Sequence, residues 1–105
     1  MEALLTLTEL FRTAFANGAV GFTLCTGLHP VIYSAKGVQT YDTQPSTFEE
    51  IDEMLRQLTT SREMRQLRAT GVVHFKCVFE SRVPLLGGAK LDGEDIRVEL
   101  RKIAA

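Results

Sequence analysis

The sequence predicts an α+β domain in which an antiparallel β-sheet has helices packed on one face. Apolar residues recur with a helical period in residues 4–15 and 48–67, and with a period of two in residues 19–25, 73–79 and 96–100. Short turns separate the strands of each group, and such turns can join only antiparallel neighbours because parallel strands need a long crossover. The expected order is one helix, two or three strands, two helices, and two or three strands.

The composition is that of an ordinary globular chain. The 105 residues are 45% hydrophobic and 24% charged, and we expect a single domain over residues 1–105. The net charge of −1 creates no field that would gather a phosphate backbone, so we expect no nucleic-acid partner. The sequence has neither a secretory leader pattern nor about 18 consecutive apolar residues, so we expect no membrane insertion and a cytoplasmic location.

The first helix is predicted from an amphipathic stripe. Thr6 and Glu9 have the spacing of a capping box, and Asn17-Gly18 suits the left-handed turn that ends a helix. The apolar residues of the stripe are Leu4, Leu7, Phe11, Ala14 and Phe15.

A β-hairpin region is predicted to follow this helix. In residues 19–25 we expect Val20, Phe22 and Leu24 to form the buried phase of a strand. Residues 31–34 form a second short strand, and Val38, Thr40 and Tyr41 indicate a third.

Two consecutive helices are predicted in the middle of the chain. Ser46 with Glu49 and Thr60 with Glu63 both have capping-box spacing, and Gly71 is expected to end the second helix. The buried stripe of the first of these helices comprises Phe48, Ile51, Leu55 and Leu58. In the second, Met64 and Leu67 face inward.

The last third of the chain is predicted to be β-structure. The inward residues of its two clearest strands are Val73, Phe75, Cys77 and Phe79, and then Ile96, Val98 and Leu100. Pro84 is expected to confine its strand to a sheet edge or a bulge. We interpret "LLGGAKLDG" as a flexible hairpin, with a tight turn at Asp92-Gly93.

Few residues are candidates for chemistry. Cys25 and Cys77 are expected to be buried reduced thiols, although a disulfide is open if their strands are neighbours. His29 is expected to lie exposed in a turn, and His74 to face solvent from a strand. A Cys25–His29 nucleophile pair would need a base within reach and an orienting third group, which the sequence does not reveal. We predict no catalytic residues and no metal site.

No cofactor is predicted either. The glycines and the lysine near residue 90 lack the spacing of a phosphate-binding loop, so we do not expect nucleotide hydrolysis. The one candidate interaction face is basic, because arginine is favoured at protein interfaces. It comprises Arg62, Arg65 and Arg68 on the third helix, together with Arg82.

The chain as a whole resembles the N-terminal domain of PilT-type twitching-motility ATPases, the retraction motors of the type IV pilus and secretion ATPase superfamily. The resemblance covers roughly residues 3–103. It rests on "LFRTAFANGAVGFTLCTGLHPVIY" and on the strand segments "GVVHFKCVFESRV" and "IRVELRKI". In the first segment Gly18, Ala19, Phe22, Leu24, Gly27 and Pro30 are in register with the family motif.

This resemblance implies a PAS-like fold that lacks the RecA-like motor domain. In the family this domain is not the hydrolytic centre but docks on neighbouring ATPase domains. The leading hypothesis is therefore a non-catalytic protein-interaction module whose partner is a motor ATPase or a second copy of the chain.

Two alternatives remain open. One is a PAS-like sensor of a small ligand, in which Phe22, Phe75 and Phe79 would line a cavity. The other is a thiol enzyme, in which Cys25 or Cys77 would be a reactive nucleophile.

Overall fold

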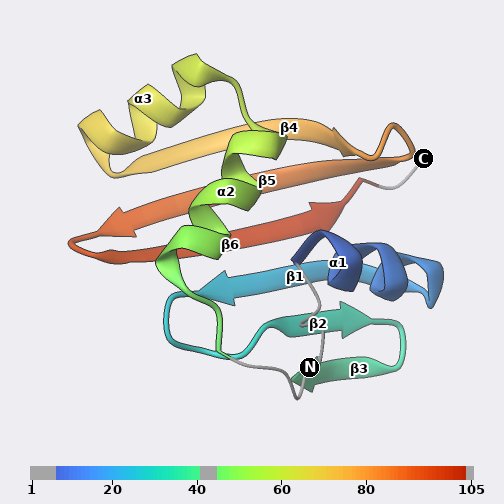
Figure 1. Ribbon diagram of the computed structural model, residues 1–105. Coiled ribbons are helices and arrows are strands. Elements are labelled where there is room, and N and C mark those ends of the chain that lie inside the picture. The colour runs from blue at the N-terminus through green and yellow to red at the C-terminus, as the bar shows by residue number, and fades with distance from the viewer. Residues whose placement is uncertain (1–6, 41–44, 104–105) are drawn as a thin grey trace, which may run out of the picture.

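The described part of the chain forms a single six-stranded antiparallel sheet with three helices on one of its faces (Figure 1). The computed structural model describes residues 7–40 and 45–103. The helices are α1 (Leu7–Ala16), α2 (Phe48–Leu58) and α3 (Ser61–Thr70). The strands are β1 (Ala19–Cys25), β2 (Val31–Ser34), β3 (Gly37–Thr40), β4 (Val72–Phe79), β5 (Val83–Asp92) and β6 (Asp95–Lys102). The predicted α+β class and element order are confirmed.

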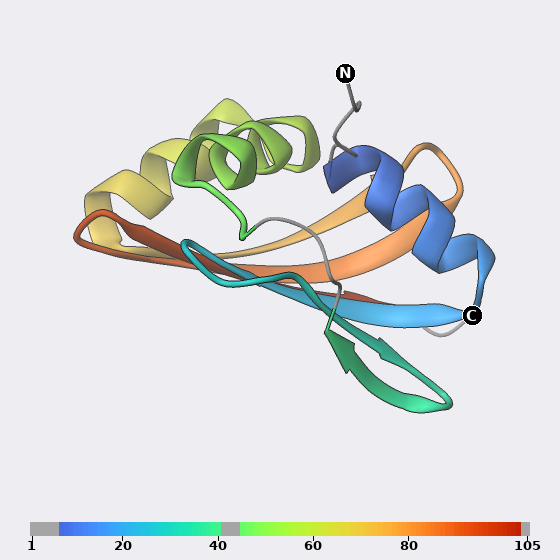
Figure 2. The same ribbon diagram turned by 60° about the horizontal axis from the view of Figure 1, so that its bottom comes forward.

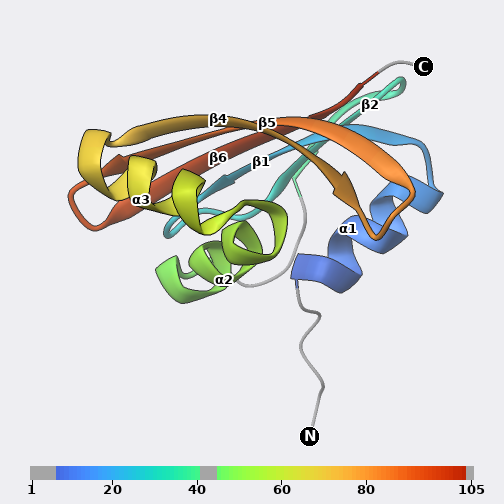
Figure 3. The same cartoon turned by 90° about the horizontal axis from the view of Figure 1, so that it is seen from above.

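The strands are arranged in the order β3-β2-β1-β6-β5-β4, and every neighbouring pair is antiparallel. The two hairpin groups join through β1 and β6, so the first and last strands of the chain lie side by side in the middle of the sheet. Figures 2 and 3 show all three helices on the same side of the sheet and the β2–β3 hairpin bending away from them.

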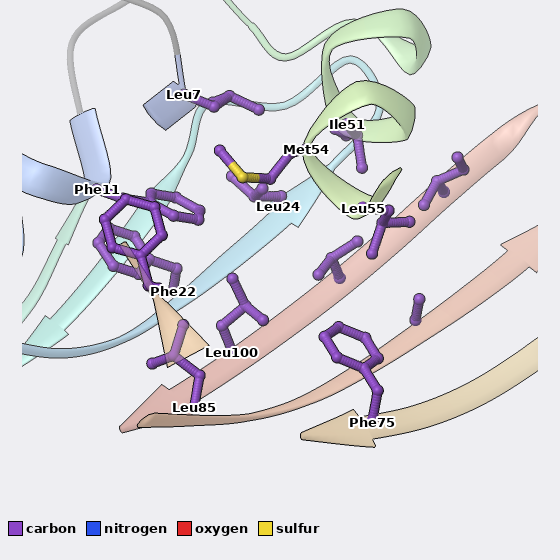
Figure 4. Packing of buried hydrophobic residues seen from close by; sticks show 14 of the residues in the cluster. Leu7, Phe11, Phe22, Leu24, Ile51, Met54, Leu55, Phe75, Leu85 and Leu100 are labelled. Atoms are coloured by element: carbon purple, nitrogen blue, oxygen red, sulfur yellow. The ribbon is translucent and has the colours of Figure 1, made fainter. Parts of the chain in front are cut away.

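The core lies between the helices and this covered face. Phe11 of α1 stacks on Phe22 of β1 with ring centroids 4.0 Å apart, and Ile51 and Leu55 of α2 are fully buried (Figure 4). The inward phases predicted for β4 and β6 are confirmed, although Cys77 is only half-buried. Hydrophobic burial of this kind is the main force that holds a helix layer on a sheet.

The predicted inward position of Val20 is wrong. Val20 is 43% exposed, whereas Phe22 and Leu24 are buried as expected. The cause is an irregularity in the β1–β2 pairing between Ala19 and Gly21, which is typical of a β-bulge and interrupts strict alternation.

The capping box of α2 lies one residue later than predicted. Thr47 is the N-cap, its hydroxyl accepts a hydrogen bond from the Glu50 backbone N–H, and the Glu50 carboxylate accepts one from the Thr47 backbone N–H. Ser46 is instead buried, because backbone hydrogen bonds to Gly27 and Leu28 hold it against the β1–β2 connection.

The signals at the two ends of α3 are confirmed. Thr60 and Glu63 form a capping box with the same reciprocal hydrogen bonds, and Gly71 ends the helix with a φ of 83°. Gly18, after α1, also has a positive φ, of 91°. The predicted Leu4, Thr6 and Tyr41 lie outside the described residues.

The flexible hairpin predicted for "LLGGAKLDG" is wrong. Residues 85–92 of this segment belong to β5, the longest of the described strands, which lies inside the sheet between β4 and β6. The expected edge or bulge position of Pro84 is wrong, because β5 lies between β4 and β6. The missing N–H is tolerated because Pro84 is the second residue of β5 and lies just beyond the β5–β6 pairing, which begins at Leu85. The Asp92-Gly93 turn is confirmed, since a tight turn joins Asp92 to Asp95.

Within the described ranges, no helix is both long enough and apolar enough to span a lipid bilayer.

Candidate interaction surfaces

The face of the sheet opposite the helices, here called the outer face, is covered by none of the described elements (Figures 2 and 3). Strand alternation places every second residue of each strand on it. Several of these residues are apolar and at least a third exposed, which is unusual for a sheet face that meets only water. They are Tyr33, Val38, Val72, Val78 and Leu86, and Val20 at the bulge of β1 is exposed beside them.

A hollow of about 400 Å³ lies in the middle of the outer face. Gly21 and Gly88 lie in its lining, and Tyr33, Leu86 and Arg101 surround them. A Cβ atom at Gly21 would come within 2.8 Å of the Leu100 carbonyl oxygen, so only glycine fits there. The hydroxyls of Tyr33 and Thr23 are hydrogen-bonded at 2.9 Å, which holds the tyrosine at the rim.

Charges on the outer face are arranged in rows that cross the strands. The strand register places Asp92 beside Asp95, and Lys90 beside Arg97. Gly88 lies beside Glu99, so the third row carries one acid. In the fourth row Arg101 and Lys76 flank Leu86. The sign of the charge therefore alternates from row to row.

The structure places the predicted basic face on two different elements. Arg62, Arg65 and Arg68 lie exposed on α3, as predicted. Arg82 lies in the β4–β5 turn, at the end of the sheet where Arg12 of α1 contacts Glu80. The four arginines thus do not share one element, although each is exposed.

A second hollow, of about 430 Å³, lies between α1 and the β4–β5 turn. At its rim Arg12 donates two hydrogen bonds to the Glu80 carboxylate, at 2.9 and 2.6 Å. These bonds lower the pKa of Glu80 and raise the pKa of Arg12. The pair ties the helix to a turn in which both Glu80 and Ser81 have positive φ values.

The cysteines and histidines do not assemble into a site. Cys25 and Cys77 are free thiols on β1 and β4, which are separated by two strands, so the disulfide alternative is excluded. Burial raises the pKa of Cys77 to about 11, with a smaller contribution from Glu63. His29 and His74 are exposed, as predicted. Among the described residues, no three potential metal ligands of the histidine, cysteine and carboxylate kinds lie together.

The aromatic residues considered for a ligand cavity pack into the core. Phe22, Phe75 and Phe79 are at most 4% exposed. Phe22 stacks on Phe11, and Phe79 lies 5.9 Å from Phe11 between ring centroids. These rings fill the space under the helices rather than line a cavity.

Comparisons with known proteins agree with the predicted resemblance. No family model and no curated protein matches this sequence. Among solved structures, the pilus retraction motor PilT with bound ADP aligns with a TM-score of 0.81 at 14% identity over 96% of this chain. The chain has the fold of one PilT domain. Because the match covers 30% of the PilT chain, it is consistent with an N-terminal domain and not with the whole motor.

Two DotB ATPases have the same fold. DotB from Legionella pneumophila aligns with a TM-score of 0.77 at 16% identity, over 99% of this chain and 31% of its own. DotB from Yersinia pseudotuberculosis aligns with a TM-score of 0.68 at 11% identity, over 93% of this chain and 29% of its own. The chain therefore spans about a third of the length of these ATPases, and the likeness concerns the fold.

The outer-face hollow and the charge rows were not found from the sequence. The alternation of acid and base in "DIRVELRK" was a visible signal, but its rows depend on which strands become neighbours. The glycines of the β5 segment favour a flexible hairpin in the sequence alone and so conceal the pairing of β5 with β6.

Proposed function

We propose that this domain is a non-catalytic protein-interaction module, an accessory to a motor ATPase of the PilT and DotB kind. The observation that carries the proposal is the fold match to about a third of each ATPase. A domain of a larger motor contacts other domains through part of its surface. The outer face, which none of the described elements covers, is the surface that we propose for such contacts. The partner is a PilT-type ATPase or a second copy of this chain.

The candidate contacts are the outer face and the exposed arginines. Arg62, Arg65 and Arg68 form a basic stripe on α3, and Arg82 adds a charge near the second hollow. Arginine is well suited to such contacts because its planar guanidinium group can donate two parallel hydrogen bonds to one carboxylate. We propose that these arginines contact carboxylates of the ATPase partner.

The test has two parts. The purified chain is assayed with Mg-ATP for hydrolysis and for saturable nucleotide binding, and neither is expected. Sedimentation with a purified PilT-type ATPase is expected to show a complex. A variant with glutamate at positions 62, 65 and 68 should weaken this complex at least tenfold, because it replaces attraction by repulsion.

The control is Lys36→Glu, which changes an exposed charge in the β2–β3 turn and should leave the complex unaffected. Specific turnover of ATP by the chain alone would refute the non-catalytic role. Failure of both the ATPase and the chain itself to bind would refute the interaction role.

The sensor alternative retains no specific support, because its three aromatic residues are core residues. The thiol-enzyme alternative is disfavoured in the case of Cys77, since a thiol with a pKa of about 11 is protonated at neutral pH.

A further inference from the structure

The charge rows of the outer face are self-complementary under a two-fold rotation. The outward positions of β6 are Asp95, Arg97, Glu99 and Arg101, which alternate in sign along the strand. A two-fold axis that crosses the strands at the level of Val98 reverses this order. Position 95 of one copy then lies opposite position 101 of the other, and position 97 lies opposite position 99. Each of these pairs unites an acid with a base.

The neighbouring strands extend the same complementarity. Asp92 is level with Asp95, and Lys76 is level with Arg101 through Leu86. The same rotation places this acidic row opposite the basic row of the second copy. Lys90, level with Arg97, comes opposite Gly88 in the row that carries Glu99 on the adjacent strand. All four charge rows therefore meet rows of opposite sign, which is what an interface between identical surfaces requires.

We propose that the outer face binds the outer face of a second copy of this chain, with the two sheets stacked antiparallel. This proposal rests on the proposed function, because it assumes that the outer face is an interaction surface. It specifies a second copy of the chain as the partner. The exposed apolar side chains Tyr33, Leu86 and Val78 would be buried between the sheets. The hollow over Gly21 and Gly88 leaves room for a side chain of the opposite copy.

The size and the free charges of the face agree with this arrangement. A strand residue covers about 16 Å² of sheet, so the six strands present roughly 700 Å². A standard interface buries about 800 Å² per partner. Within the described part of the chain, Arg97 pairs with Glu99 at 3.2 Å, but no ion pair includes Asp95 or Arg101. These two residues are available to a second copy.

Two single variants with opposite changes test the pairing. Asp95→Arg leaves two bases at positions 95 and 101, and Arg101→Asp leaves two acids. Each variant alone should dimerise at least tenfold more weakly than the wild type, because like charges now face each other. An equimolar mixture should recover the dimer as a heterodimer, since every base of one variant faces an acid of the other.

Sedimentation equilibrium and multi-angle light scattering measure these dissociation constants. Arg56→Asp on α2 is the matched control, because it makes the same charge change at an exposed position on the helical side and should leave the dimer intact. Thermal unfolding establishes that each variant is folded. Dimerisation of the wild type should also weaken at high salt, as expected for exposed ion pairs.

A wild-type chain that is monomeric at about 100 μM, or single variants that dimerise like the wild type, would overturn the proposal. So would a mixture that fails to recover the dimer. These outcomes differ from a failure of the proposed function, because a monomeric chain that still binds a PilT-type ATPase leaves the interaction role in place.

Discussion

At the residue scale, two side chains show how position decides chemistry. Cys77 and Val78 are neighbours on β4, but Cys77 points towards the helices and Val78 is 56% exposed on the outer face. Partial burial solvates the thiolate less well than water does, and this raises the pKa of Cys77 to about 11. A cysteine at an exposed position of the outer face would not have its reactivity lowered by burial in this way.

Alkylation should detect the raised pKa of Cys77. Below about pH 9 only a small fraction of this thiol is ionised, and thiolate is the reactive form. In a Cys25→Ser background, iodoacetamide at pH 8 should label the folded protein about a hundredfold more slowly than the urea-unfolded protein, as a shift of two pKa units implies. Equal rates would contradict the burial of Cys77.

The same shift has a consequence for stability. The folded-state pKa lies above the unfolded value, so the neutral thiol is favoured in the folded state. The stability that the protonated Cys77 thiol provides is constant below about pH 9 and is lost as the pH rises from 9 towards 11.

Gly87 and Gly88 are adjacent glycines with different requirements. Gly87 faces the core, and a Cβ atom there would lie 2.4 Å from the ring of Phe75. Gly88 faces outward, and its Cβ would meet His74 at an ordinary 3.4 Å. Gly87→Ala should therefore lower the free energy of unfolding by about 1–3 kcal/mol, whereas Gly88→Ala should change it by less than about 0.5 kcal/mol.

Urea denaturation measures both values. Phe75→Leu combined with Gly87→Ala should recover part of the loss, because the smaller side chain makes room for the new methyl group. Equal effects of the two glycine variants would show that the contact with Phe75 does not constrain position 87.

At the element scale, helix starts are decided by the backbone that precedes them. Ser46 and Thr47 are both good N-cap residues, and each has a glutamate three positions later. The backbone of Ser46 is hydrogen-bonded to the backbone of Gly27 and Leu28, which holds Ser46 outside the helix. The helix can therefore begin only after Thr47. The buried Ser46 hydroxyl has no hydrogen-bond partner among the described residues.

Alanine substitutions distinguish these two positions. Thr47→Ala removes the capping hydroxyl and should cost about 1 kcal/mol of stability. Ser46→Ala removes a buried hydroxyl that has no hydrogen-bond partner within residues 7–40 and 45–103, so it should be neutral or stabilising. Guanidinium denaturation curves compare the two, and a larger loss for Ser46→Ala would place the cap where the sequence predicted it.

At the scale of the whole molecule, one core joins all three helices to the sheet. Phe11 packs on Phe22 and Phe79, which lie on strands from the two halves of the chain. The sheet itself joins these halves through β1 and β6. Such an arrangement unfolds as one unit, because loss of either half exposes the other half's core.

Two probes should therefore give one transition. Far-UV circular dichroism reports the helices, and in a Tyr41→Phe background tyrosine fluorescence reports Tyr33 on β2. Both should show the same denaturant midpoint, and Phe11→Ala should lower both by the same amount. Separate midpoints would mean that the β2–β3 hairpin region unfolds independently of the helices.

The sequence by itself determined the local elements, because periodicity and caps are properties of neighbouring residues. The inward phases of β4 and β6, the start of α3 at Thr60 and its end at Gly71 all follow from such local signals. Only the tertiary structure decided that residues 85–92 belong to an interior strand, since Gly87 is explained by the ring of Phe75 on another strand. The outer-face rows likewise required the pairing of β4, β5 and β6, because which residues become neighbours across a sheet depends on register and not on spacing along the chain.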